Sequence, residues 1–444
     1  MRRTGPLLVA AVLAIGTALV PIGSAQAVDP SCDSQQGDLN PIEALPWAQR
    51  MYDPANKLQP FSRGAGVTVA VLDSGVDPTH FQLAGKVLPG IGFVPDAPPV
   101  GRIDCVPFGT AVASIIAAEP VGGIGFYGLA PRATILPVRV SEGIHTNPDD
   151  EALPAGVLAE GMDYAVANGA DVVAVSAVSY DSDPVLQSAV ARAVVAGVIV
   201  VAAAGDGHNE SQEGLRPDLE FPYPAAYDGV IGVGSIGADG QRSGTSQIGP
   251  YLDLVAPGLD VTAAAFGGHD SYNGTGIAVG FVAAAAALML GQPGTDLRQL
   301  SGTQLVDVLT GRLYATADAT VGGAPSLAYG KGLVDPYRAM NEATGGVPQA
   351  VDDPRRPPPD EAALALAAQR AAANDSSLRD ALLFGGLALV VLAIAFVWPR
   401  ARRHKWLPGR ERELLEGTED KRPEHLPGEM LFRNSADKVK QDRS

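Results

Sequence analysis

Short apolar runs rich in β-branched residues alternate with segments of helical periodicity along the middle of the chain. The runs that predict strands are 67–73, 134–140, 171–176 and 198–204, and the segments that predict helices are 109–118, 157–167 and 185–196. Continuously apolar strands that alternate with helices form parallel sheets covered on both faces. We therefore expect an α/β fold, with a mostly parallel β-sheet and helices on both of its faces.

The start of the chain has the composition of a secretory signal. A short basic stretch precedes the apolar run 7–22, and SAQA at 24–27 has the small-residue pattern of a signal-peptidase site. We predict a signal peptide over 1–27, followed by a globular domain with an N-terminal extension over 28–344. An uncleaved membrane anchor is the competing interpretation, but the run is short and ends in proline and glycine.

A second apolar stretch, LLFGGLALVVLAIAFVW at 382–398, predicts one transmembrane helix. A buried core helix is the alternative, but the stretch has no polar face, and the basic residues that follow it mark the cytoplasmic side. The Pro/Ala-rich segment 345–381 is then a stalk outside the membrane. Residues 399–444 are a cytoplasmic tail whose mixed charge and weak apolar periodicity predict disorder.

Composition limits the partners and the bound groups. The formal net charge of −17 argues against nucleic acid as a partner. Cys32 and Cys105 are the only cysteines, and an oxidising compartment favours a disulfide between them, with two buried free thiols as the alternative. Neither the cysteines nor the histidines have the spacing of a zinc site. Asp149 and Asp150 could hold calcium, but exposed loop charges explain them more simply. We expect no metal and no cofactor.

Candidate chemistry begins at Asp73, because open parallel sheets place their chemistry at the carboxyl ends of strands. Asp73 ends the first strand-like run in VAVLDSGVD, where an aspartate alone is more often a turn residue. This block resembles the aspartate motif of the subtilisin-like serine proteases (peptidase S8). Later blocks follow the family order of Asp, His and Ser. GLAPRATILPVRV at 128–140 is similar to a Gly-x-Ala-Pro segment of that family, and DVVAVSAV at 171–178 resembles the strand that lines its substrate cleft.

Three positions of the resemblance carry a different residue here. FGTAVASIIAA puts Phe108 at the histidine position, YNGTGIAVG puts Gly276 at the serine position, and VVAAAGD puts Asp206 at the position of the oxyanion-hole asparagine. Acyl transfer by this triad needs an Oγ nucleophile, an imidazole base and a donor for the oxyanion. The resemblance therefore predicts an inactive homologue that is not an enzyme, in which Asp73 is the retained triad acid.

The layout of the whole chain resembles the mycosins, the membrane-anchored subtilisin-like proteases of type VII secretion. The shared features are a signal peptide, a cysteine before the histidine block, a proline-rich stalk, one span and a basic tail. The resemblance implies a subtilisin-like fold and subunits of a type VII membrane complex as partners. It also implies a single-pass protein of the bacterial cell membrane, with the main domain extracytoplasmic and the C-terminus cytoplasmic.

Three functions follow from these observations. The first is a pseudoprotease, a structural or regulatory part of a type VII secretion complex. The second is a peptide-binding module in which the cleft captures an extended segment without cutting it. The third is an active serine-type endopeptidase with relocated catalytic residues, for which His208 and Ser271 are the candidates.

Overall fold

The computed structural model describes residues 42–95, 97–150, 153–209, 214, 217–319, 321 and 325–342. All of them belong to one compact unit of the chain, Met1–Arg356. The predicted signal peptide, Cys32, the stalk, the predicted span and the tail lie outside the described residues, so the domain boundaries stay predictions. Within the ranges given above, no helix combines the length and the apolar character needed to cross a membrane.

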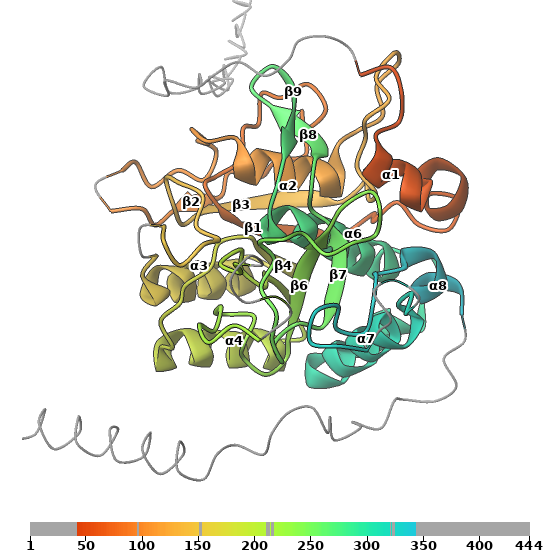
Figure 1. The fold of residues 1–444 in the computed structure, drawn as a ribbon. Coiled ribbons are helices and arrows are strands. Elements are labelled where there is room, and N and C mark those ends of the chain that lie inside the picture. Colours follow the sequence, from red (N-terminus) through yellow and green to blue (C-terminus); the bar gives the residue numbers. More distant parts are fainter. Residues whose placement is uncertain are drawn as a thin grey trace, which may run out of the picture. The chain divides into compact units, whose positions relative to one another are not determined.

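A seven-stranded parallel sheet forms the centre of this unit, in the order β2-β3-β1-β4-β5-β6-β7 (Figure 1). The strands are β1 (Thr68–Asp73), β2 (Ile91–Gly92), β3 (Thr134–Arg139), β4 (Val172–Val175), β5 (Ile199–Ala203), β6 (Val230–Ile236) and β7 (Leu254–Pro257). A separate antiparallel hairpin joins β8 (Val261–Ala265) to β9 (Gly268–Tyr272). The parallel order brings the carboxyl ends of β1, β4 and β5 side by side.

Alternate residues of each strand enter one of two hydrophobic cores, one on each face of the sheet. In β1, Val69 and Val71 join the core that contains α2 (Phe108–Ala117) and α6 (Thr275–Leu290). Ala70 and Leu72 join the other core, with α3 (Ala155–Ala167) and α4 (Pro184–Val195). Both faces of the strand are buried, which explains why its sequence is continuously apolar.

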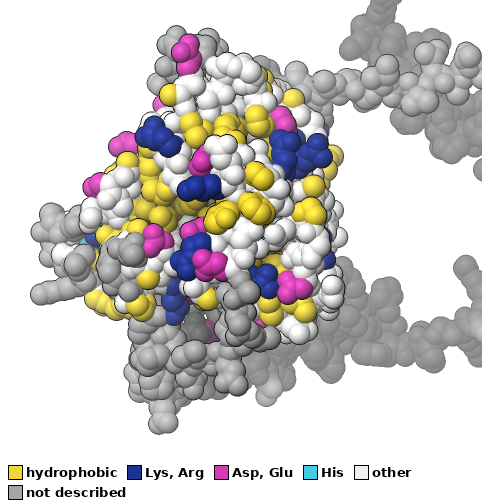
Figure 2. Space-filling model, turned by 90° about the vertical axis from the view of Figure 1, so that its right-hand side faces the viewer, with side chains coloured by type: hydrophobic (Ala, Val, Ile, Leu, Met, Phe, Trp, Pro, Cys, Tyr) yellow, Lys and Arg dark blue, Asp and Glu magenta, His cyan; other side chains and the backbone are white. Residues whose placement is uncertain are grey.

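The other helices of the described residues are α1 (Trp47–Tyr52), the π-helical turn η1 (Pro54–Leu58), the 3₁₀ turn η2 (Asp296–Gln299), α7 (Gly302–Thr316) and α8 (Pro336–Asn341). They pack around the edges of these layers, with α1 against β8, α8 against α6, and α7 against α4 and α8. Figure 2 shows the right-hand side of Figure 1, on which basic and acidic side chains are intermixed with hydrophobic ones. This face therefore does not present a surface of a single charge sign.

The predicted α/β architecture, with a parallel sheet and helices on both faces, is confirmed. The strands and helices predicted from the apolar runs lie within two residues of the observed bounds. The strand β6 was not predicted, because its sequence VIGVGSI interrupts the apolar run with two glycines and a serine.

Candidate active site at the carboxyl ends of the strands

Asp73 is the last residue of β1 and is 2% exposed. The Ser74 backbone N–H donates to Asp73 Oδ1 at 2.5 Å, and the Ser176 hydroxyl donates to Asp73 Oδ2. The pKa of Asp73 is raised to about 7, mainly by burial and to a smaller extent by the nearby Asp104 carboxyl, while the hydrogen bonds from Ser176 and Ser74 lower it. Asp73 is therefore a buried carboxyl that exchanges its proton near neutral pH.

A second buried carboxyl, Asp104, fixes the loop that leads into α2. It accepts hydrogen bonds from the Ser74 hydroxyl at 2.8 Å and from the Thr110 N–H and hydroxyl at 2.8 and 2.6 Å. The Ser74 hydroxyl in turn accepts from the Gly109 N–H at 3.1 Å. Asp104 was not predicted from the sequence as a site residue. The only signal in the sequence is its position directly before Cys105. Its contacts hold the start of α2 against the end of β1.

Phe108 and Gly276 adjoin each other next to Asp73. Phe108 begins α2, is 2% exposed and lies edge-on to Tyr272, with 6.2 Å between the ring centroids. A Cβ added to Gly276 would lie 2.8 Å from Phe108 Cε1 and 3.2 Å from Ser176 Cβ. The structure therefore brings together the three positions predicted for the triad, and the ring of Phe108 fills the space beside Gly276.

Asp206 lies at the N-terminus of α6. Its two carboxylate oxygens both accept from the Thr275 N–H at 3.0 Å, and the Thr275 hydroxyl donates to Oδ2 at 3.2 Å. The positive end of a helix favours an anion in this place. Burial nevertheless raises the pKa of Asp206 to about 6, with the hydrogen bonds from Thr275 opposing that rise. Asp206 thus occupies the N-terminus of α6; its assignment to the position of the oxyanion-hole asparagine stays a prediction.

The candidates for relocated chemistry lie apart from one another. His208 is buried and its Nδ1 pairs with Asp218 at 2.9 Å, while its Nε2 contacts the Gly214 carbonyl at 2.6 Å. Ser271 is an exposed residue of β9 that pairs with Thr262 across the hairpin. The His208–Asp218 pair was not predicted, because its members are ten positions apart in the sequence and no local pattern links them.

Two further predictions concern cysteines and metals. Cys105 is disulfide-bonded, but its predicted partner Cys32 lies outside the described residues, so the pairing stays a prediction. Among the residues that the structure describes, no group of three or more His, Cys, Asp or Glu side chains could hold a metal ion.

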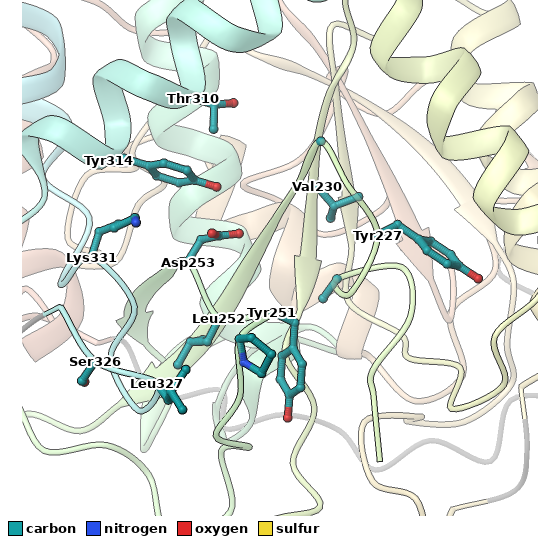
Figure 3. Close-up of a pocket in the computed structure, with 13 residues that line it drawn as sticks. Tyr227, Val230, Tyr251, Leu252, Asp253, Thr310, Tyr314, Ser326, Leu327 and Lys331 are labelled. Carbon is teal, nitrogen blue, oxygen red and sulfur yellow. The ribbon is translucent and has the colours of Figure 1, made fainter. Parts of the chain in front are cut away.

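A separate pocket of about 230 Å³ lies at the opposite ends of the strands (Figure 3). Val230 begins β6, Tyr251 shortly precedes β7, and Tyr314 of α7 faces them across the pocket. Asp73 ends β1 and Asp206 follows β5, so both lie at the carboxyl ends of their strands. The pocket is thus not part of the candidate site.

Comparison with known protein families identifies the fold. The model of the subtilase family (peptidase S8) matches residues 64–332. The chain belongs to the subtilase family. As a subtilase it is 35% identical over 273 residues to Subtilisin NAT of Bacillus subtilis subsp. natto, an alignment that covers 61% of this chain and 65% of that protein. It is 32% identical to Mycosin-1 of Mycolicibacterium smegmatis over 338 residues, covering 66% of this chain and 72% of that one.

Solved structures of two mycosins resemble this subtilase. One is the serine protease MycP1, described as an essential component of the type VII (ESX-1) secretion system, with a TM-score of 0.57 and 28% identity. The match covers 71% of this chain and 99% of MycP1. The other is the MycP3 protease of the type VII (ESX-3) secretion system, with a TM-score of 0.57 and 26% identity, covering 72% of this chain and all of the MycP3 chain. The predicted subtilisin-like fold is confirmed.

The prediction that this subtilase is not an enzyme is contradicted by these similarities, because its relatives are subtilisins and mycosin proteases. That prediction rested on the side chains at Phe108, Gly276 and Asp206. Those residues argue against one arrangement of hydrolytic groups, whereas the fold is that of the subtilases and Ser176 donates a hydrogen bond to Asp73. Replacement of three side chains was too narrow a basis for excluding an activity of the whole site.

The buried carboxyl of Asp73 predicts a pH-dependent stability. Its pKa in the folded chain is about 7 against an ordinary value of 3.8, so the folded state binds more protons than the unfolded state between these values. The corresponding stabilisation is present below about pH 4 and is lost as the pH rises through about 7. The Asn side chain in Asp73→Asn cannot ionise. We therefore expect the change in the free energy of unfolding caused by this substitution to be more stabilising at pH 8 than at pH 4, by about 2–4 kcal/mol.

Urea unfolding followed by tryptophan fluorescence at both pH values measures this difference. Asp307→Asn, which changes an exposed carboxyl on α7, is the matched control and should behave alike at both pH values. Equal effects of Asp73→Asn at pH 4 and pH 8 would show that the Asp73 carboxyl does not titrate in the folded chain as described.

The contact between Phe108 and Gly276 predicts energetic coupling. Gly276→Ala should destabilise the fold by ~1–3 kcal/mol, because its Cβ would press on the Phe108 ring. In the double variant with Phe108→Leu, the loss of folding stability should be about 1 kcal/mol smaller than the sum of the losses in the two single variants. A second cycle with Phe126→Leu, a buried ring that contacts His269 instead, should be additive within ~0.5 kcal/mol. Additivity in both cycles would contradict the contact.

Proposed function

We propose that this protein is a mycosin-like serine endopeptidase that acts on extended polypeptides at a type VII secretion system. Membership of the subtilase family supports the reaction class. The similarity to MycP1 over 99% of that chain supports the association with type VII secretion. The alignment covers 65% of the length of Subtilisin NAT and of Subtilisin E, and we propose that this chain shares their activity.

The observation that carries the proposal is the Asp73–Ser176 pair. A catalytic hydroxyl needs a base that is partly ionised near neutral pH, and the pKa of Asp73 is about 7. The Ser176 hydroxyl already donates a hydrogen bond to Asp73. The Ser176 Cβ lies 3.2 Å from the position that a Cβ at Gly276 would occupy. Ser176 thus offers a nucleophile close to the position that the family motif assigns to serine.

The reaction proceeds by acyl transfer. Ser176 Oγ bonds to the carbonyl carbon of the peptide while its proton passes to Asp73. The carbon–nitrogen bond then breaks, and Asp73 returns the proton to the leaving amine; water hydrolyses the acyl-enzyme by the same steps. The positive end of α6 near Gly276 favours the oxyanion. An ionised Asp206 opposes that charge.

A second candidate function is the capture of a peptide without cleavage. The Phe108 ring fills the space beside Gly276, and an apolar wall of this kind suits binding more than proton transfer. An extended peptide would add to the strand ends through main-chain hydrogen bonds. This function requires the same cleft and the same partners as the first.

The location of the protein is part of the proposal. We place the described unit on the outer side of the bacterial cell membrane, with the predicted span at 382–398 as its anchor and 399–444 in the cytoplasm. The similarity to mycosins supports this arrangement. In this arrangement, the main domain contacts subunits of the type VII membrane complex, and the predicted Cys32–Cys105 disulfide ties its N-terminal extension to the loop before Phe108.

Labelling with a serine-directed fluorophosphonate tests the reaction. We expect the full-length protein to hydrolyse casein and to be labelled at Ser176. Ser176→Ala should lower both signals at least a hundredfold, because it removes the nucleophile. Ser271→Ala, the exposed serine of β9, is the control and should leave them unchanged. Hydrolysis that survives Ser176→Ala would contradict the assignment, and casein binding without hydrolysis would favour the second candidate.

Isolation from native membranes tests the partner. We expect subunits of a type VII secretion complex to copurify with the tagged protein in mild detergent, because the resemblance to mycosins extends over the whole described unit. Mass spectrometry identifies them. Copurification should persist in Asp73→Asn, since the contact surface does not depend on the buried carboxyl. Recovery of the protein alone would contradict the proposed association.

A further inference from the structure

A loop of the protein lies across the ends of β4 and β5. After β3 the chain continues to residues 145–147, which we call the strap. The Val178 N–H, three residues past the end of β4, donates to the His145 carbonyl at 2.6 Å. The Asp206 N–H, just past β5, donates to the Thr146 carbonyl at 2.6 Å. Two consecutive carbonyls of the strap therefore occupy main-chain donors at neighbouring strand ends.

Side chains hold the strap in this position. The Asp150 carboxylate accepts from the Thr146 and Asn147 N–H groups at 3.1 and 2.9 Å. The Tyr180 hydroxyl donates to the Thr146 carbonyl at 2.8 Å, so this carbonyl accepts two hydrogen bonds. The next residue, Pro148, lies against Gly207, where an added Cβ would come within 2.3 Å of its ring. The absence of a side chain at Gly207 permits this close approach.

The donors that the strap occupies are those that a bound peptide needs. An extended peptide that binds beside exposed main chain does so through main-chain N–H and carbonyl groups. The Val178 and Asp206 N–H groups lie beside Ser176 and the N-terminus of α6, where the proposed function places the peptide. With the strap in place, both donors are satisfied and the peptide has no partner there.

We propose that the strap is an autoinhibitory segment that competes with an extended peptide for the Val178 and Asp206 N–H groups. This proposal rests on the proposed function and names its regulation. The closed form leaves Ser176 1% exposed. Release of the strap frees both donors at once, because the two carbonyls belong to adjacent residues.

The test compares Asp150→Ala with Asp149→Ala in the full-length protein. Asp150→Ala removes the acceptor that fixes two strap amides. Asp149→Ala leaves those bonds intact, because only the backbone N–H of Asp149 contacts Asn147. Hydrogen exchange measured by mass spectrometry reports the opening of the strap, and fluorescence anisotropy of fluorescein-labelled casein reports binding of an unfolded polypeptide.

We expect Asp150→Ala to speed exchange of the Val178 and Asp206 amides at least tenfold and to tighten casein binding at least threefold. Asp149→Ala should match the wild type. The Val201 amide in the core of β5 should exchange at the wild-type rate, which shows that the variant is folded. Tyr180→Phe, which removes one donor to the strap, should change both quantities in the same direction by a smaller amount.

Three other outcomes are informative. Unchanged exchange in both Asp150→Ala and Tyr180→Phe would overturn the proposal. Faster exchange with equal or weaker casein binding would overturn it as well, because competition requires tighter binding. Faster exchange with no casein binding in any variant would contradict the proposed function, while supporting the strap as a segment that opens.

Discussion

The burial of α6 is the constraint on which the rest of the structure depends. All sixteen residues of this helix are buried, and it packs against β4 to β7 on one side and against α2 on another. A helix surrounded by protein must be apolar all round, and a close approach to the sheet favours small side chains. The run of alanines in α6 satisfies both requirements. Its N-terminus is thereby fixed beside the ends of β4 and β5, which places Gly276 next to Phe108 and Ser176.

Three buried carboxyl groups lie at the ends of β1 and β5 and before the start of α2. Asp73, Asp104 and Asp206 accept hydrogen bonds from hydroxyl and main-chain N–H groups. Burial raises the pKa of each. A buried carboxyl without a cation holds its proton more tightly, since desolvation disfavours the charged form. The site is therefore poised to exchange protons rather than to hold a fixed negative charge.

The layers of the fold were predictable from sequence because continuously apolar strands need helices on both faces. The positions of Asp73, Phe108 and Gly276 followed from the order of the motifs, and the structure brings them together. The contacts that give the site its chemistry were not predictable. Ser176 lies 103 residues from Asp73 in sequence, and no local pattern predicts their hydrogen bond. The prediction of an inactive protein failed for a related reason, since it judged three side chains without the neighbours that surround them.

Asp206 connects the proposed regulation to the chemistry. Its backbone N–H is held by the strap, and its carboxylate is held by the N-terminal amide of α6. A peptide that displaces the strap takes over the first of these bonds, while the second sets the charge near the developing oxyanion. Both bonds belong to one residue, so the proposed release of the strap would act on the residue whose carboxylate lies at the N-terminus of α6. The proposed regulation and the electrostatics of the site therefore meet at Asp206.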